Sequence, residues 1–406
     1  MRIVYICATF PWEGGGEAFF LPEIRELLRL GHELRFLPRS ASGRLTPEAE
    51  ELGPISINAP LFSFEVARAA LAEVWSKPLR SLRALRVVLR ASPTTALKNL
   101  AVFPKALYVS RVANAWGASH IHAQWASTTA TIALVASELS SIPWSFTGHR
   151  GDIVANNLIG QKVHRAKFVR VISDSGACML GRALAPEEAR KVRCIHMGLD
   201  VSRAPPVPIA TANRLVLACP ANMIPVKGHR YLLEAVQTLA EEGLDCKLRL
   251  FGDGELRGQL EAQCTRLGIA ARVTFHGHVP RSQLLSAYER GEIGIVVLPS
   301  LDLGHDLHEG IPVSLIEAMT YGVPVVSTTT GGIPELLAGN AGMLVPPGDA
   351  SALARAVHLL ATDPLAYQSY ATAGRARVES SFDVRSVIRE LLSAIDSRTT
   401  AEGARR

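Results

Sequence analysis

The six cysteines of this 406-residue chain never stand in a C-x-x-C spacing. Zinc ribbons and thioredoxin-like redox sites need such pairs, so buried free thiols in a reducing compartment are expected instead. Uncharged apolar runs of the roughly 18 residues that a membrane-spanning helix needs are also absent. The first apolar run, residues 2–8, is broken by Pro11 and three glycines, which fits a buried strand better than an export signal. We therefore expect a cytoplasmic protein.

The fingerprints of two other kinds of ligand site are missing. The three glycines at 14–16 do not make G-x-G-x-x-G, and no acidic residue ends the second expected strand, so NAD binding is disfavoured. No D-x-D sequence suggests a bound divalent cation. His120 and His122 form an H-x-H pair, but without a third ligand in view we expect packed or hydrogen-bonded histidines. No metal site is predicted.

The composition is that of a globular protein, with 48% hydrophobic and 20% charged residues. Its length suits two domains of roughly 150–200 residues. Short apolar runs alternate with helical patterns, as in strand 3–8, helix 17–30 and strand 33–38, and this alternation is typical of parallel sheets. Residues 61–116 interrupt it with mostly helical patterns. The predicted fold class is α/β, with two Rossmann-like, doubly wound domains.

A proline-rich stretch at 203–213 reads as a linker. The predicted domains are residues 1–202 and 214–380, followed by a C-terminal helix and frayed tail at 381–406. Further strands are expected near 119–122, 143–147, 168–172, 192–196, 214–219, 246–251, 272–276, 293–298, 324–328 and 342–345. Ligands of such sheets bind at the carboxyl ends of the strands. The loops at 14–16 and at Glu309 are therefore expected to face each other across a cleft.

The most informative stretch runs from Glu309 to Glu317. A buried strand at 297–300 leads into the loop that carries Glu309, and a helix from Ser314 to Tyr321 carries Glu317. The N-terminus of this helix has free backbone N–H groups, which suit a phosphate. One carboxylate beside a diphosphate and another near vicinal hydroxyls is an arrangement suited to a nucleotide-sugar.

This stretch resembles the E-x7-E motif of retaining glycosyltransferase family 4, and the chain is similar to its exopolysaccharide and colanic-acid-type members. Lys227-Gly228 resembles the family's Arg-x4-Lys-Gly diphosphate clamp, with Asn222 at the arginine position. The turn at 252–254 is similar to the family's Gly-Asp-Gly-Pro turn, and residues 275–279 to a strand end whose backbone contacts the nucleobase. The segment at 146–152 resembles one in which His149 contacts the donor sugar. The resemblance implies the GT-B fold, with the C-terminal helix returning toward the first domain.

The resemblance also implies residue roles. Glu309 would hold the hydroxyls of the transferred sugar and Glu317 those of the ribose, while Lys227 would stabilise the leaving diphosphate and His149 would fix the sugar. The implied donor-binding residues are Gly15, Gly16, Asn222, Gly252, Val279, Gly310, Ile311, Val313, Ser314, Leu315 and Glu317. Arg150 and Asp152 are candidates for acceptor binding, with a salt bridge and a helix cap as the alternatives. Gly331 and Gly332 are expected to shape a loop.

Charge is unevenly distributed along the chain. Of the net +6, residues 1–205 carry +9, with 25 basic against 16 acidic residues, and the rest carries −3. Between Arg68 and Arg111, nine basic residues face one acid, Glu73. A solvated helix face is one interpretation. Attraction to an anionic membrane surface or a phosphate-bearing acceptor is another. Nucleic acid is disfavoured because no binding motif accompanies the charge.

These patterns predict a retaining glycosyltransferase that moves a hexosyl unit from a nucleoside-diphosphate sugar, its co-substrate, without metal or another cofactor. The expected acceptor is a glycan or lipid-linked glycan in cell-surface polysaccharide biosynthesis. The enzyme would be cytoplasmic, with a peripheral position on the inner face of the membrane as a further expectation. Two alternatives stay open. One is a nucleotide-sugar epimerase of the same fold. The other is a non-catalytic nucleotide-sugar-binding subunit, which the uncharged Asn222 at the family's arginine position would fit.

Overall fold

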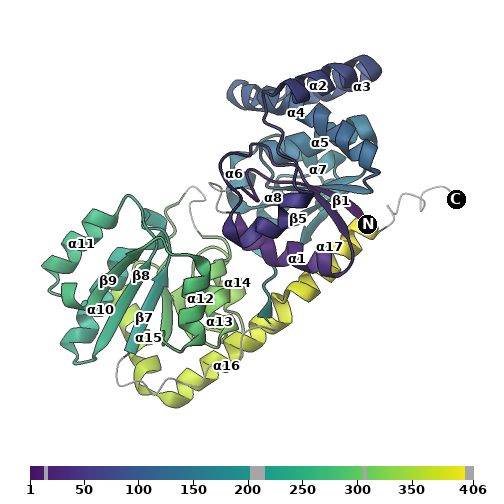
Figure 1. Cartoon of the computed structure of the whole chain (residues 1–406). Coiled ribbons are helices and arrows are strands. Elements are labelled where there is room, and N and C mark those ends of the chain that lie inside the picture. The colour runs from purple at the N-terminus through teal and green to yellow at the C-terminus, as the bar shows by residue number, and fades with distance from the viewer. Residues whose placement is uncertain (13–16, 202–214, 305–308, 398–406) are drawn as a thin grey trace. The chain divides into compact units, whose positions relative to one another are not determined.

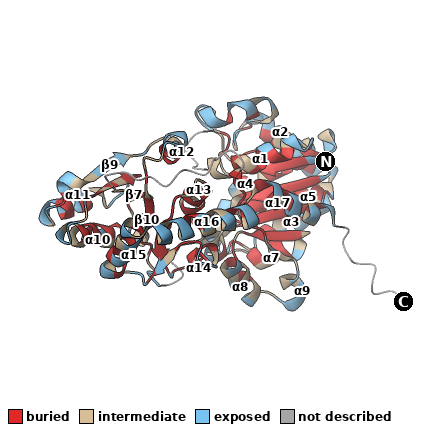
Figure 2. Ribbon diagram, turned by 90° about the horizontal axis from the view of Figure 1, so that it is seen from below, coloured by how far each residue is buried: buried red, intermediate tan, exposed pale blue. Residues whose placement is uncertain are grey.

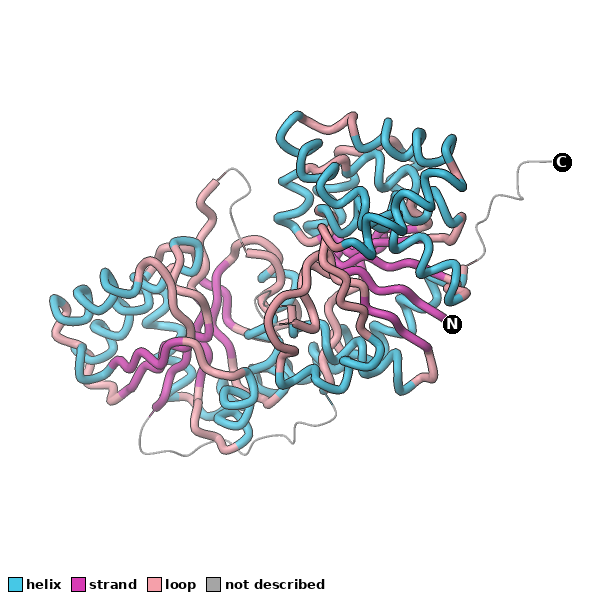
Figure 3. The backbone as a smooth tube through the Cα atoms, turned by 45° about the horizontal axis from the view of Figure 1, so that its top comes forward, coloured by secondary structure: helices cyan, strands magenta, loops and turns pink. Residues whose placement is uncertain are grey.

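The computed structural model describes residues 1–12, 17–201, 215–304 and 309–397 (Figure 1). The chain divides into two compact units. Unit 1 comprises Met1–Gly198 and the segment from Val384 onward, and unit 2 comprises Leu199–Asp383. The expected linker at 203–213 and the glycines at 14–16 lie outside the described residues. Figure 3 shows that each unit has one sheet flanked by helices.

The first sheet has six parallel strands in the order β2-β1-β3-β4-β5-β6. These are β1 Arg2–Ile6, β2 Glu33–Phe36, β3 His120–Gln124, β4 Trp144–Gly148, β5 Phe168–Val171 and β6 Val192–Cys194. Every residue of β3 and β4 is buried, as expected for central strands of a parallel sheet. The predicted strands agree with these bounds to within two residues at each end.

The helices of unit 1 cover both faces of this sheet. They are α1 Leu21–Arg29, α2 Phe64–Ser76, α3 Pro78–Val88, α4 Pro93–Trp116, α5 Thr128–Ser140, α6 Arg150–Ala155, α7 Ile159–Arg165, α8 Asp174–Arg182, α9 Pro186–Ala189 and α17 Val384–Asp396. The predicted helical insertion at 61–116 is confirmed as α2, α3 and α4. The predicted helix 17–30 is instead a 3₁₀ turn at Ala18–Phe20 followed by α1.

Unit 2 holds the second parallel sheet, in the order β12-β11-β10-β7-β8-β9. Its strands are β7 Leu215–Pro220, β8 Cys246–Phe251, β9 Val273–Gly277, β10 Ile295–Leu298, β11 Val325–Thr328 and β12 Met343–Val345. Its helices are α10 His229–Glu241, α11 Arg257–Arg266, α12 Arg281–Glu289, α13 Val313–Thr320, α14 Ile333–Leu336, α15 Ala350–Thr362 and α16 Pro364–Ser381. The strand order changes direction at β10 and β7, so this is a doubly wound sheet.

Buried residues concentrate along the strands and on the inward faces of the helices (Figure 2). In unit 1 the apolar core lies in two clusters, and one of them joins β1 and α1 to α17. Ile388 and Leu391 of α17 are buried there with Ile24 of α1. Four cysteines are buried, but Cys178 is exposed, so the expectation of buried thiols is wrong at that position. No helix in the described part of the chain is both long and apolar enough to cross a membrane.

A fully buried ion pair crosses the core of unit 1. Arg170 of β5 donates to both carboxylate oxygens of Glu23 in α1, each at 2.7 Å. The Arg170 Nε donates to the Ile195 carbonyl at 2.9 Å, and Glu23 also accepts the backbone N–H of Gly198 at 2.8 Å. Because each charge has several partners, the pair ties α1, β5 and the end of the first chain segment together.

The chain leaves unit 1 and re-enters it at neighbouring residues. A Cβ on Gly198 would lie 2.8 Å from the Cα of Val384, so only glycine fits there. One residue further on, the N–H of Leu199 donates to the Phe382 carbonyl at 2.9 Å. Leu199 also forms an isolated parallel bridge with Asp383. The two crossing segments therefore run side by side.

Candidate functional site

A pocket of ≈ 260 Å³ opens at the carboxyl ends of β7, β8 and β9, beside the start of α13. It is lined by Pro220, Ala221, Asn222, Phe251, Gly252, His278, Val279, Arg281, Leu284, Ser314 and Glu317. Five of these lining residues are predicted donor-binding residues: Asn222, Gly252, Val279, Ser314 and Glu317. The structure thus gathers residues up to 95 positions apart around one hollow of the size of a small ligand.

Glycines are required at the base of this pocket. Gly252 has φ +130°, and a Cβ there would lie 2.3 Å from the Ala221 carbonyl oxygen. Its N–H donates to the Gly277 carbonyl at 2.8 Å. The close approach of the three chain segments after β7, β8 and β9 depends on the missing side chain. Steric contact therefore explains why a glycine stands at position 252, in the turn that resembles the family's Gly-Asp-Gly-Pro turn.

Lys227 and Glu309 are in direct contact. The Lys227 ammonium donates to Oε2 of Glu309, and the Ser300 hydroxyl donates to the same oxygen at 3.3 Å. Both charged side chains are largely buried, with 19% and 16% of their surface exposed. Gly228 follows in a left-handed conformation, where a Cβ would lie 2.0 Å from the Pro299 carbonyl oxygen. The turn at Lys227 and Gly228 therefore packs closely against the loop after β10. This packing holds Lys227 next to Glu309.

Glu317 has a partner that the sequence did not reveal. Nε of Arg281, the first residue of α12, donates to its Oε1, and the glutamate side chain is only 7% exposed. Arg281 lines the pocket and is 35% exposed. The only sequence signal was a basic residue opening a helix after the strand end at 275–279. The pair holds the Glu317 carboxylate at the pocket wall.

Among the described residues, four other predicted donor residues do not line the pocket: Gly310, Ile311, Val313 and Leu315. The side chains of Ile311 and Leu315 are buried in the core of unit 2, so only their backbone remains for a ligand. The Leu315 N–H already donates to the Pro312 carbonyl at 3.1 Å. Gly310 and Val313 lie in the loop and at the first residue of α13. A contribution of the Leu315 N–H to phosphate binding stays a prediction.

The loop at 330–333 packs against the Glu309 loop. The Gly332 N–H donates to the Glu309 carbonyl at 3.3 Å, and a Cβ on Gly332 would lie 2.9 Å from Ile311. Gly331 has φ +58°. Both glycines therefore shape this contact, in line with their expected role.

In unit 1, His149 directly follows the last residue of β4 and is the N-cap residue of α6. Its Nε2 lies 3.2 Å from Nε2 of Gln124, and its ring centroid lies 4.2 Å from that of Trp125. Burial lowers the pKa of His149 to about 3, with a smaller contribution from Arg170. The imidazole is therefore neutral at pH 7 and offers hydrogen bonds without a charge.

Asp152 acts as a helix cap. Its Oδ2 accepts the backbone N–H of His149 at 3.3 Å, and burial raises the pKa of this carboxyl to about 6. Asp152 therefore caps α6, as one of the two interpretations of this residue expected. Its role in acceptor binding stays a prediction. Arg150, the first residue of α6, is half-buried next to it.

Two buried charged residues near His149 were not found from the sequence. The Glu17 carboxylate accepts the backbone N–H groups of residues 8–10, at 3.1, 2.8 and 2.9 Å, and also the indole N–H of Trp125. The Lys162 ammonium donates to the carbonyls of Ala126 and Ser127, each at 2.8 Å, and burial lowers its pKa to about 7. Glu17 and Lys162 therefore fix the loop that holds Trp125 against His149.

The H-x-H pair is hydrogen-bonded, as expected. Nε2 of His120 and Nδ1 of His122 lie 2.7 and 2.8 Å from the same hydroxyl, that of Ser145. Nε2 of His122 lies 3.0 Å from the Thr147 hydroxyl. Within the described residues neither histidine belongs to a group of three potential metal ligands.

Residues 206–377 match the family described as Glycosyl transferases group 1. This segment is a glycosyl transferases group 1 domain. The structure of HepE from Anabaena in complex with UDP matches 98% of this chain and 100% of its own length, with a TM-score of 0.69 and 19% identity. The chain therefore has the predicted GT-B fold, built of two Rossmann-like domains.

Two relatives illustrate the range of this group. A colanic acid biosynthesis glycosyltransferase of Escherichia coli K12, WcaL, is 34% identical over 242 residues, which is 58% of each chain. A GDP-mannose-dependent phosphatidylinositol monomannoside mannosyltransferase of Mycolicibacterium smegmatis is 27% identical over 302 residues, 70% of this chain and 77% of its own. The matches to the colanic acid enzymes thus span 58% of those proteins. The predicted similarity to glycosyltransferases of colanic-acid type is confirmed.

Proposed function

We propose that this protein is a retaining glycosyltransferase that transfers a hexosyl unit from a nucleoside-diphosphate sugar to a glycan or lipid-linked glycan during exopolysaccharide biosynthesis. The carrying observation is the pocket that unites Asn222, Ser314 and Glu317 in the glycosyl transferases group 1 domain. The named activities of WcaL and of an amylovoran biosynthesis glycosyltransferase support the pathway class. UDP in HepE and GDP-mannose in the mycobacterial relative support a nucleoside-diphosphate donor.

In this proposal the nucleoside lies in the pocket and Glu317 accepts hydrogen bonds from the ribose hydroxyls. The diphosphate then lies at the N-terminus of α13 and near Lys227. When the bond between the anomeric carbon and the diphosphate oxygen breaks, negative charge grows on the leaving group. The lysine cation and the helix dipole stabilise that charge without reorganising. Glu309, held by Lys227 and Ser300, accepts hydrogen bonds from the transferred sugar.

Retention requires the acceptor hydroxyl to attack the face that the diphosphate leaves. The acceptor oxygen forms the new bond to the anomeric carbon, and its proton passes to the departing diphosphate. No enzyme nucleophile takes part, so the rate depends on positioning. The neutral imidazole of His149 suits this scheme, since it hydrogen-bonds a sugar hydroxyl without adding charge next to the cation-like sugar.

Incubation with a panel of nucleotide-sugars tests the proposal. Slow release of nucleoside diphosphate from one of them, accelerated by a glycan acceptor, is the expected result. Conversion of the donor to its epimer would instead identify the epimerase alternative. Tight donor binding without any release, in the presence of varied acceptors, would identify a non-catalytic binding subunit.

Activity is expected without a divalent metal, because Lys227 and the α13 N-terminus supply the positive potential that a metal supplies elsewhere. The measurement is transfer rate in excess EDTA, with added magnesium or manganese as the comparison. Rates with and without metal should agree within about twofold. A complete loss in EDTA that manganese restores would contradict this expectation.

Replacing Asn222 by arginine should tighten binding of the nucleoside diphosphate. Asn222 lines the pocket, and the resembling family places an arginine at this position. A bidentate guanidinium–phosphate contact could add roughly 1.5–3 kcal/mol to the binding free energy. Calorimetric titration with UDP and GDP measures it, and Asn222→Gln is the matched control without a charge. Weaker binding by Asn222→Arg than by Asn222→Gln would show that the pocket has no room for the arginine.

A further inference from the structure

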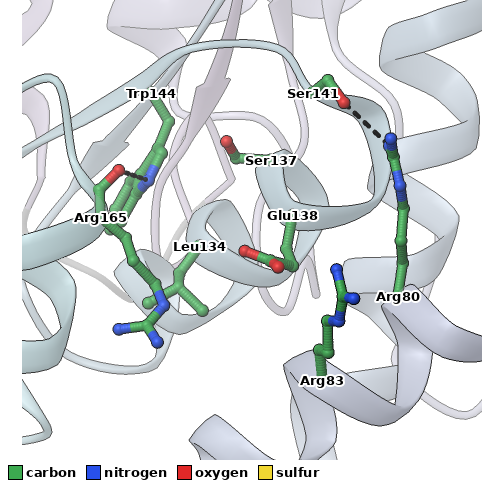
Figure 4. A pocket seen from close by; sticks show the side chains of 8 residues that line it. All are labelled: Arg80, Arg83, Leu134, Ser137, Glu138, Ser141, Trp144 and Arg165. Atoms are coloured by element: carbon green, nitrogen blue, oxygen red, sulfur yellow. Dashed lines mark hydrogen bonds between the residues drawn. The ribbon is translucent and has the colours of Figure 1, made fainter.

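A second hollow, of ≈ 300 Å³, lies in unit 1 (Figure 4). It is lined by Arg80, Arg83, Leu134, Ser137, Glu138, Ser141, Trp144 and Arg165. These residues come from α3, from α5 and the residue that follows it, from the last residue of α7 and from the first residue of β4. The hollow is therefore at the amino ends of the strands, whereas His149 follows the carboxyl end of β4. It belongs to neither the proposed donor site nor the surroundings of His149.

Three guanidinium groups and one carboxylate face this hollow. Arg80 donates to the Leu139 carbonyl at 3.2 Å and to the Ser141 hydroxyl at 2.8 Å, so its position is fixed at the end of α5. Arg165 is held by the Gln161 side chain at 2.8 Å. Figure 4 shows Arg83 and Arg165 on opposite sides of Leu134 and Glu138.

The net formal charge of these four side chains is +2. Within the described residues, none of them forms an ion pair with a side chain within 4.0 Å. Guanidinium groups present planar pairs of donors that match phosphate oxygens, and they stay charged at any physiological pH. The chemistry of the hollow therefore fits a phosphate group, with Glu138 as an opposing charge.

Exposed apolar side chains lie on α2 and on α3, the helix that supplies Arg80 and Arg83 to the hollow. Trp75 at the end of α2 is 90% exposed, and Leu79 and Leu82 of α3 are 71% and 43% exposed. Leu79 and Arg83 are four residues apart on one helix, so they are neighbours on its surface. In the same segment Val87 and Val88 are buried in the core. Large exposed apolar groups rimmed by basic ones mark an interaction site.

Two of the nine basic residues in segment 68–111 do not belong to the exposed, unpaired set that the sequence suggested. Lys105, one of the nine basic residues of segment 68–111, is fully buried and donates to the Ala59 carbonyl. Lys77 is paired with Glu73 at 2.5 Å. The interpretation of all nine as one solvated or membrane-facing set is therefore wrong for these two. The other seven are exposed, and three of them, Arg80, Arg83 and Arg86, belong to α3.

We propose that the hollow between α3, α5 and α7 binds the phosphate of an anionic lipid headgroup while Trp75, Leu79 and Leu82 enter the interfacial layer of the membrane. Charge complementarity with an anionic surface favours this occupant. The exposed apolar side chains favour a lipid over a free phosphate ion, which would gain nothing from them. The inference goes beyond the proposed function, because sugar transfer does not require it.

Vesicle flotation tests the proposal with matched charge changes. The double variant Arg83→Gln/Arg165→Gln removes two charges that line the hollow, and Arg86→Gln/Arg90→Gln removes two from α3 and the residues just after it that do not line it. On vesicles of phosphatidylcholine with phosphatidylglycerol, we expect the first variant to bind roughly tenfold more weakly than the second at the same salt concentration. Glu138→Gln should bind more tightly than the parent protein. Pure phosphatidylcholine should bind all variants weakly.

Three outcomes decide the matter. Competition by soluble glycerol phosphate, lost in Arg83→Gln/Arg165→Gln, supports a headgroup site. Equal weakening of both double variants would overturn it in favour of diffuse attraction. Binding of inorganic phosphate without any binding to anionic vesicles would overturn the lipid assignment. UDP titration of each variant separates these results from the proposed function, because donor binding should stay unchanged even if the headgroup site fails.

Discussion

Glu309→Gln should lower the rate of sugar transfer by at least roughly a hundredfold while the protein stays folded. The substitution keeps the shape of the side chain but removes the charge that faces Lys227, to which Glu309 is ion-paired. In the proposed reaction the carboxylate accepts hydrogen bonds from the sugar and orients the lysine beside the diphosphate. Both effects act on the chemical step, so kcat should fall much more than the affinity for the nucleoside diphosphate changes.

The comparison needed is Glu241→Gln, an exposed glutamate at the end of α10, which should leave transfer unchanged. Thermal unfolding of both variants reports whether the fold survives. Full turnover by Glu309→Gln would remove this residue from the site. A variant that fails to fold would assign Glu309 a structural role at the contact with Lys227 and Ser300, and the proposed role in sugar binding would lose its support.

The second large effect is expected in unit 1, on stability. Glu23→Gln should lower the free energy of unfolding of unit 1 by about 3–5 kcal/mol, because it leaves the buried Arg170 guanidinium without its ion-pair partner. Both side chains of this pair are fully buried. Urea denaturation followed by circular dichroism measures the change.

Glu33→Gln is the matched control, because Glu33 pairs with Arg2 at 3.2 Å while 59% of its side chain is exposed. Exposed ion pairs contribute up to about 1 kcal/mol, so this variant should differ little from the parent. Equal effects of Glu23→Gln and Glu33→Gln on the free energy of unfolding would show that water reaches Arg170 in the folded protein.

The sequence predicted the strands well because local information suffices for them. A run such as Val296–Leu298 can hardly be anything but a buried strand in an alternating α/β chain, and the glycine turn at 252–254 follows from the same local logic. The order of the strands was not predicted, since pairing depends on which distant segments meet. The carboxylates Glu309 and Glu317 could be found because their spacing and loop context repeat a known motif.

The partners of those carboxylates could not be found in the same way. Arg281 lies 36 positions from Glu317 and Lys227 lies 82 positions from Glu309, and nothing in the local pattern links either pair. Buried lysines show the limit most clearly. A charged residue is rarely fully buried, so the position of Lys105 beneath the helices can be known only from the structure. The same holds for Lys162, whose two carbonyl partners belong to another segment.

The route of the chain has a consequence for how the protein is made. Part of the core of unit 1 is supplied by α17, whose residues emerge from the ribosome only after all of unit 2. Ile388 and Leu391 must reach Ile24 after more than 360 residues have been synthesised. Unit 2 is contiguous and can close its core first, which reverses the usual N-terminal-first order. Until α17 arrives, the apolar face around α1 is uncovered, and the nascent protein is then most exposed to chaperones and to aggregation.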